Sequence, residues 1–117
     1  MSSYGLEIQI LYPTRRLIIK YIVTVRGNLK GSVEQAQAAH DDTVQKVSPM
    51  GRSMGNTSHQ AYLNIQNNNE FFAIDVWDNL ESIQKLYSDP NLAAEFARMF
   101  EGQPEVTVWA DSGWFQF

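Results

Sequence analysis

The order in which strand-like and helical segments alternate constrains the fold of this chain more than any other feature. Residues 16–27 (RLIIKYIVTVRG) are rich in β-branched side chains, which predicts a strand that ends at Gly27. Two more strand patterns, residues 59–65 and 70–77, flank the sequence QNNN, which is typical of a hairpin turn. A last strand is predicted over residues 105–110. One helical segment precedes the hairpin and another follows it, so the predicted order is βαββαβ.

The first helical segment has a clear start and an expected end. Ser32 and Gln35 form the pattern of a capping box, in which each side chain accepts a hydrogen bond from a backbone N–H of the first turn. We expect the helix to end near Val47, because Pro49 does not readily continue a helix. Residues 48–58 (SPMGRSMGNTS) contain two glycines and are predicted to form a loop.

The second helical segment follows the hairpin and is interrupted once. Asp78 or Asn79 can cap its first part. Asp89 can cap the second part, with Pro90 at the favoured first position of a helix. Gly102 is the predicted C-terminal stop.

This order is that of the ferredoxin-like fold, an α+β arrangement in which two helices cover one face of a four-stranded antiparallel sheet. The other face is half apolar in this chain, with expected contributions from Ile18, Ile22, Phe71, Ala73 and Trp109. An uncovered apolar face calls for a partner, and a second copy of the chain is the simplest one. We therefore expect a homodimer whose two sheets pack face to face.

Composition limits the remaining possibilities. The 117 residues correspond to one domain, 1–117, with a lead-in over residues 1–15 that contains a short strand at 6–11, and an aromatic tail over 111–117. The net charge of −4 offers no basic surface for nucleic acid, and the absence of cysteine excludes disulfides and thiolate ligands. Since the sequence shows neither a signal-peptide pattern nor an apolar run of membrane-spanning length, we expect a cytoplasmic protein that does not enter a membrane.

The most specific pattern lies in residues 70–100. Asp75 and Trp77 stand one residue apart at the end of a predicted strand, and a helix, the break SDP and Phe96 follow. This combination resembles the antibiotic biosynthesis monooxygenase-like group of the dimeric α/β-barrel superfamily. The resemblance implies a dimeric α/β barrel with a pocket in each subunit, between the sheet and the helices.

The resemblance also implies a chemistry. Some members of the group oxidise phenolic polyketides with oxygen and without a cofactor, some degrade haem, and many have no known activity. In haem-degrading relatives a histidine on the helix after the Trp binds iron, whereas Tyr87 stands at that place here. The Asn that several active relatives carry on the first strand is also missing from residues 17–26. The resemblance therefore implies a small aromatic ligand and no cofactor.

Two residues are candidates for catalysis. Cofactor-free oxygenation needs a base, polar donors for the resulting anion and an apolar cavity. His40, on the sheet-facing stripe of the first helix, is the preferred base because histidine titrates near neutral pH, and Asp75 is the second candidate. Two structural alternatives stay open. If His40 is not catalytic, it is a hydrogen-bonded histidine of the core. If Asp75 is not catalytic, it is either exposed or paired with Tyr62, Lys20 or Arg26.

Further side chains are candidates for substrate binding. Trp77 can stack on a flat aromatic ligand, or else pack as an ordinary strand-end residue. His59 opens a strand directly after a polar loop, which favours an exposed position. A metal site made by the two histidines and Asp75 would lack a close-spaced ligand pair, so no metal is predicted. The full set of candidate binding residues is Trp77, Tyr62, Tyr87, Tyr21 and His59.

The alternation of residues 70–77 conflicts with this site. Phe72, Ile74 and Val76 form the more apolar face of the strand and are expected to meet the helices. That parity would send Asp75 and Trp77 towards the dimer interior. A bulge near residues 73–75 would reconcile the two expectations.

The sequence thus supports one main hypothesis and two alternatives. The first is a cofactor-independent monooxygenase that acts on an aromatic or polyketide-like molecule. The alternatives are a non-catalytic ligand-binding or dimerisation module of the same fold, and a cyclase or isomerase that works by acid–base chemistry.

Overall fold

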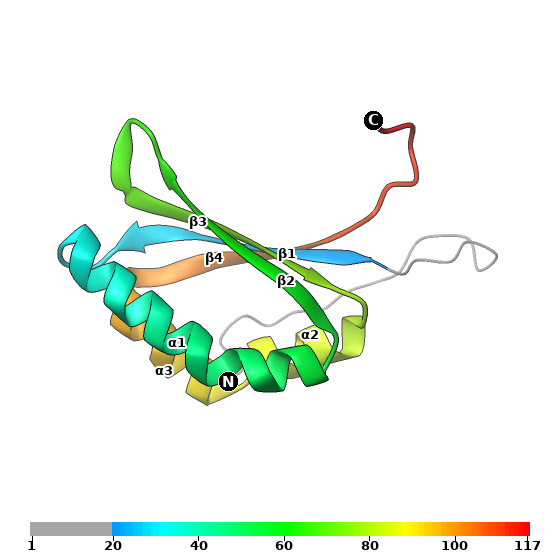
Figure 1. The fold of residues 1–117 in the computed structure, drawn as a ribbon, viewed down its shortest axis with the longest axis horizontal. Helices are drawn as coiled ribbons and strands as arrows, with labels where there is room; N and C mark the ends of the chain where they lie inside the picture. The colour runs from blue at the N-terminus through cyan, green and yellow to red at the C-terminus, as the bar shows by residue number, and fades with distance from the viewer. Residues whose placement is uncertain (1–19) are drawn as a thin grey trace.

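The computed structural model describes residues 20–117, which form one four-stranded antiparallel sheet with three helices on one of its faces (Figure 1). The strands lie in the spatial order β2-β3-β1-β4. The elements in chain order are β1 (Tyr21–Leu29), α1 (Val33–Ser53), β2 (Asn56–Asn64), β3 (Asn67–Trp77), α2 (Leu80–Tyr87), α3 (Pro90–Met99) and β4 (Phe100–Ala110). This is the predicted α+β, ferredoxin-like fold, with the second helical segment divided into α2 and α3.

Several predictions about the first residues cannot be compared with the structure. The lead-in over residues 1–15, the short strand at 6–11 and the first part of the strand predicted over 16–27 lie outside the described residues, as does Ile18.

The predicted helix caps are confirmed. The Ser32 hydroxyl accepts from the N–H of Gln35, and the Gln35 side chain accepts from the N–H of Ser32. Asn79 caps α2, and Asp89 caps α3 with Pro90 in the first turn. These local hydrogen bonds satisfy backbone donors that have no partner inside the helix, which is why the sequence alone could locate them.

The predicted end of α1 is wrong. The helix does not stop near Val47 but continues through Pro49 to Ser53. An internal proline removes a backbone hydrogen bond, at a cost of about 3 kcal/mol. The last turn is nevertheless held by tertiary packing, because Gly51 is buried in that turn and lies beside Asn56 of β2.

The predicted ends of the strands also shift. β2 begins at Asn56, within the segment expected to be a loop, and the hairpin turn falls at residues 65–66 instead of QNNN. β4 begins at Phe100, so Gly102 lies inside a strand and does not stop a helix. The Phe100 ring is 2% exposed and packs edge-on against Phe71, with 5.4 Å between ring centroids. Burial of this ring against the sheet favours an early end of α3.

The expected parity of β3 is wrong as well. Paired residues on adjacent antiparallel strands point to the same side, and the register pairs Val23 with Asp75 and Val25 with Ala73. Val23 and Val25 are 0% and 3% exposed against the helices, so Asp75 and its alternate neighbours face the helices too. Phe72, expected to meet the helices, is 36% exposed on the other side.

No bulge is needed between β1 and β3. Their pairing runs without a shift from Tyr21 opposite Trp77 to Asn28 opposite Glu70. The apolar face of β1 therefore fixes which residues of β3 reach the core.

None of the three helices covers the opposite face of the sheet (Figure 1). Trp109 lies there, 54% exposed, and its indole N–H donates to the Thr24 hydroxyl at 2.9 Å. Phe71 and Ala73, which were expected on this face, instead belong to the core under the helices.

Gly55 provides a test of the turn between α1 and β2. Its φ of +111° lies in the region that L side chains rarely adopt, and a Cβ there would collide with the carboxylate of Asp78. We expect Gly55→Ala to lower the free energy of unfolding by about 1–3 kcal/mol, as measured by urea denaturation. Gly51→Ala is the matched control, because its backbone is helical and its Cβ would make only ordinary contacts, so it should not destabilise the fold. Equal losses in both variants would contradict this explanation.

Candidate functional site

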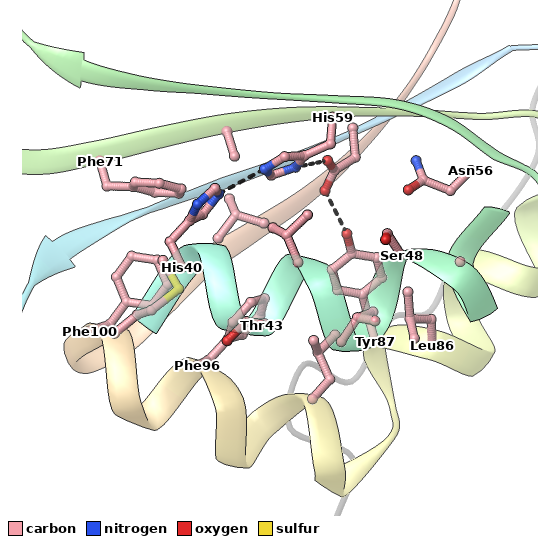
Figure 2. A pocket seen from close by; sticks show the side chains of 18 of the residues that line it. His40, Thr43, Ser48, Asn56, His59, Phe71, Leu86, Tyr87, Phe96 and Phe100 are labelled. Atoms are coloured by element: carbon pink, nitrogen blue, oxygen red, sulfur yellow. Dashed lines mark hydrogen bonds and ion pairs between the residues drawn. The ribbon is translucent and has the colours of Figure 1, made fainter. Parts of the chain in front are cut away.

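A cavity of about 90 Å³ lies between the sheet and the helices (Figure 2). Side chains from all four strands and from α1, α2 and α3 line it. Most of its wall is apolar, and only a few polar groups reach it. The larger apolar contributions come from Val25, Val44, Val47, Phe71, Leu86, Leu92, Phe96, Met99 and Phe100.

The polar part of the wall is centred on Asp75. This residue is 8% exposed, and a carboxylate in such surroundings needs hydrogen-bond partners. His59 lies directly opposite on β2, and its Nδ1 is 2.5 Å from Asp75 Oδ1. The Tyr87 hydroxyl, from the end of α2, donates to Asp75 Oδ2 at 3.0 Å.

His40 extends this chain of hydrogen bonds to α1. Its Nε2 is 2.9 Å from His59 Nε2, and the two rings stack with 5.1 Å between centroids. Its Nδ1 is 2.9 Å from Asp41 Oδ1. Dashed lines in Figure 2 join His40 to His59, and lead from His59 through an unlabelled carboxylate to the Tyr87 hydroxyl; that carboxylate belongs to Asp75.

The hydrogen bond with Asp75 raises the pKa of His59 above its ordinary value of 6.5, although burial acts in the opposite direction. β2 is an edge strand and leaves the His59 backbone open, but the side chain is only 28% exposed. Among residues 20–117, neither lysine nor arginine lines this cavity, so within this part of the chain the histidines are its side chains that can carry a positive charge.

Trp77 contributes a hydrogen-bond donor without an acceptor. The residue is 1% exposed, and its Nε1 is buried with no hydrogen-bond partner among residues 20–117. Buried donors are normally satisfied, and leaving one unpaired costs about 1–3 kcal/mol. Because Trp77 lines the cavity, a ligand oxygen is a suitable acceptor for this N–H.

The structure brings together five of the residues named from the sequence and leaves two apart. His40, His59, Asp75, Trp77 and Tyr87 all line the cavity.

Tyr21 pairs with Trp77 across the sheet and packs against the core, but it does not line the cavity. Tyr62 pairs with Phe72, a position of opposite parity to Asp75, and lines not this cavity but a second hollow that adjoins it. Asp75 was expected to be exposed or to pair with Tyr62, Lys20 or Arg26, but it is buried and its two oxygens are bound by His59 and Tyr87. Arg26 pairs with Glu70 instead.

Sequence reasoning missed the environment of His59, which was expected to be exposed. The pairing of Asn64 with Asn67 beside the turn would place His59 opposite Phe72, but a register shift between Leu63 and Asn64 sets His59 opposite Asp75 instead, and no local sequence pattern marks that shift. Asp41 was not predicted, because an acidic residue next to a histidine on a helix is not a recognisable sequence motif.

The described residues contain neither a metal site nor a membrane-spanning helix. Within residues 20–117 no group of three or more His, Asp or Glu side chains is arranged to hold a metal ion. In the same part of the chain, no helix combines the length and the apolar character required to cross a membrane.

Residues 20–117 form a ferredoxin-like α+β fold with a pocket between one face of the sheet and its helices. Comparison with solved structures identifies the fold as that of the antibiotic biosynthesis monooxygenases, which confirms the resemblance inferred from residues 70–100. No protein-family model matches the sequence, and no curated protein matches it significantly.

Three of these structures show the range of the fold. SnoaB, a cofactor-independent oxygenase from Streptomyces nogalater, has a TM-score of 0.62 and 11% identity over 83% of this chain and 95% of its own. A monooxygenase from Streptomyces coelicolor, in complex with nanaomycin D, has a TM-score of 0.64 and 13% identity over 84% and 92%. A protein of unknown function from Nitrosomonas europaea has a TM-score of 0.55 and 21% identity over 83% and 93%. At these identities the likeness concerns the fold.

The raised pKa of His59 predicts how stability depends on pH. The favourable interaction with Asp75 is complete below the unfolded-state pKa of about 6.5 and is lost as pH rises through the higher folded-state pKa. The free energy of unfolding should therefore fall as pH rises above about 6.5, as measured by urea denaturation at several pH values. Asp75→Asn should flatten this slope, whereas Glu81→Gln, which removes an exposed carboxylate on α2, should leave it unchanged. The same slope in Asp75→Asn and wild type would contradict the assignment.

Proposed function

We propose that this protein is a cofactor-independent monooxygenase that oxidises a planar phenolic molecule with several fused rings. The observation that carries the proposal is the hydrogen-bonded chain His40–His59–Asp75–Tyr87 along the wall of an otherwise apolar cavity. The shared fold with a cofactor-independent oxygenase supports it.

Each part of the cavity has a role in this reaction. The chain of His40, His59 and Asp75 takes up the proton of the substrate hydroxyl, directly or through Tyr87. The Trp77 N–H donates to a substrate oxygen and stabilises the anion that forms there. The apolar wall keeps water from the anion while it reacts with oxygen.

The oxidation is balanced without a cofactor. After loss of the hydroxyl proton, the electron-rich ring adds O₂ at the carbon across the ring and forms a peroxide anion, which takes the proton back from the histidines to become a hydroperoxide. Loss of the remaining C–H proton and cleavage of the O–O bond give a carbonyl and hydroxide, which leaves as water. The substrate ring supplies all four electrons, so one oxygen atom ends in the quinone and the other in water.

The shape of the site favours an elongated ligand. A second hollow, of about 150 Å³, adjoins the first, and His40, Phe71 and Met99 line both. Together the two hollows suit a molecule with fused rings better than a single phenol. The complex of the Streptomyces coelicolor monooxygenase with nanaomycin D supports this class of ligand.

Oxygen consumption with a panel of anthrones and hydroquinones tests the proposal. We expect uptake of one O₂ per substrate, with ¹⁸O₂ placing one labelled atom in the quinone. Trp77→Phe and His59→Gln should each lower kcat/KM by about 10²-fold or more, since single donors and bases contribute factors of this size. Trp114→Phe, which changes a side chain that is 82% exposed in the tail, is the matched control and should retain full activity.

The alternatives give different results in the same experiment. Ligand binding that weakens in Trp77→Phe, without oxygen uptake, would identify a binding module and overturn the oxygenase. Conversion of substrate without oxygen uptake would identify a cyclase or isomerase.

A homodimer is part of the proposal. The sheet face opposite the helices carries Ile22, Ile74, Val76 and Trp109. A second copy packed there would bury these side chains. Sedimentation at micromolar concentration should give twice the monomer mass of 13.3 kDa. Trp109→Arg should dissociate the dimer and Trp114→Arg should not, whereas a monomeric wild type would contradict the assembly.

A further inference from the structure

The hydrogen bonds of the two histidines determine how many protons they hold. Three links run in series: Asp75 Oδ1 to His59 Nδ1, His59 Nε2 to His40 Nε2, and His40 Nδ1 to Asp41 Oδ1. Each link requires one proton, whichever of its two atoms carries it. Two neutral imidazoles with two ionised carboxylates bring only two protons. The arrangement is satisfied when the four groups together hold three.

With fewer or more than three protons, two acceptors or two donors oppose each other at one of the links. With two protons, two lone pairs oppose each other at one of the links. With four, an N–H or O–H opposes another across 2.5 to 2.9 Å. Distances of this size are those of hydrogen bonds, and each hydrogen bond requires a proton between the two atoms.

We propose that His40 and His59 share one excess proton at neutral pH and that the Asp41 carboxylate is the positioning residue that holds it there. Asp41 does not line the cavity, and its side chain is 53% exposed. By accepting from His40 Nδ1, it leaves His40 Nε2 to accept from His59, so that both nitrogens of His59 carry protons. Nothing in the sequence pattern assigned a role to this residue.

The surroundings of the pair favour the excess proton. Asp41 approaches from α1, Asp75 from β3, and the Tyr87 hydroxyl reaches Asp75 from α2. The cavity residues from α3, β1 and β4 are apolar, and no cation among them opposes the added charge. The raised pKa of His59 is consistent with this balance.

The consequence, which rests on the proposed function, concerns when the site can act as a base. With three protons every ring nitrogen is engaged, so the pair cannot take a proton from a substrate. Release of the shared proton produces the basic form. Asp41 therefore sets the pH above which the substrate is deprotonated.

Asp41→Asn tests this by changing the proton requirement at one link. The asparagine amide can donate to His40 Nδ1, so the pair becomes fully satisfied with two protons. Asp42→Asn is the matched control, because Asp42 is the next carboxylate on α1 and its partners are Lys46 and Arg98 instead of the histidines.

The readout is the ¹⁵N NMR titration of the histidine rings, which needs neither substrate nor activity. The chain has two histidines, so four ring nitrogens are followed. In the wild type at pH 7 both Nδ1 atoms should be protonated. The ¹⁵N chemical shifts of the two Nε2 atoms should be those of nitrogens that share one proton. In Asp41→Asn the excess proton should be lost about one to two pH units lower, the effect of one hydrogen bond to a charged group. In Asp42→Asn the loss should follow the wild type.

Two results would overturn the inference: two protons on the wild-type pair at pH 7, or a wild-type titration in Asp41→Asn. Where oxygen uptake is observed, the rise of kcat with pH should also shift to lower pH in Asp41→Asn, while KM changes little. Failure of the proposed function is recognised separately, by an absence of oxygen uptake in a protein whose titration behaves as expected.

Discussion

The buried carboxylate of Asp75 is the constraint on which the arrangement of the site depends. A charge that is 8% exposed in an apolar cavity is stable only with partners, and these come from two different elements. His59 on β2 and Tyr87 at the end of α2 each bind one of its oxygens. His40 then joins α1 to the same group through His59. One acidic residue on β3 thereby ties the edge strand and two helices together around the cavity.

The position of the pocket is a property of the shared fold, whereas the polar side chains that line the pocket are a property of this particular sequence. The fold is shared with oxygenases and with proteins of unknown function, so it specifies where a pocket lies but not what the pocket does. The polar wall of the cavity belongs to this chain: it holds a histidine pair between two carboxylates, and Trp77, whose N–H has no acceptor among residues 20–117, lines the same cavity. A mostly apolar pocket with a few convergent polar groups is typical of small-molecule sites.

Features set by neighbouring residues could be predicted from the sequence. The order of elements follows from periodicity, and the caps at Ser32, Asn79 and Asp89 follow from hydrogen bonds within one helical turn. Where a long-range contact decides, prediction failed. α1 passes through Pro49 because its last turn packs on β2, and α3 ends early because the Phe100 ring is buried. Neither contact can be inferred from the residues that neighbour it in the sequence.

The sequence by itself determined the fold class and named His40, His59, Asp75, Trp77 and Tyr87 as chemically useful residues. Only the tertiary structure decided that they share one cavity. The physical reason is strand parity: a shift of one residue turns every side chain of a strand to the other face, and the sequence of β3 is apolar on both faces. Its register against the buried face of β1 turned Asp75 and Trp77 towards the helices. Its register against β2 placed His59 beside Asp75. The packing of α1 against the sheet then brought His40 within hydrogen-bonding distance of His59, and so created the proton-sharing pair that we propose.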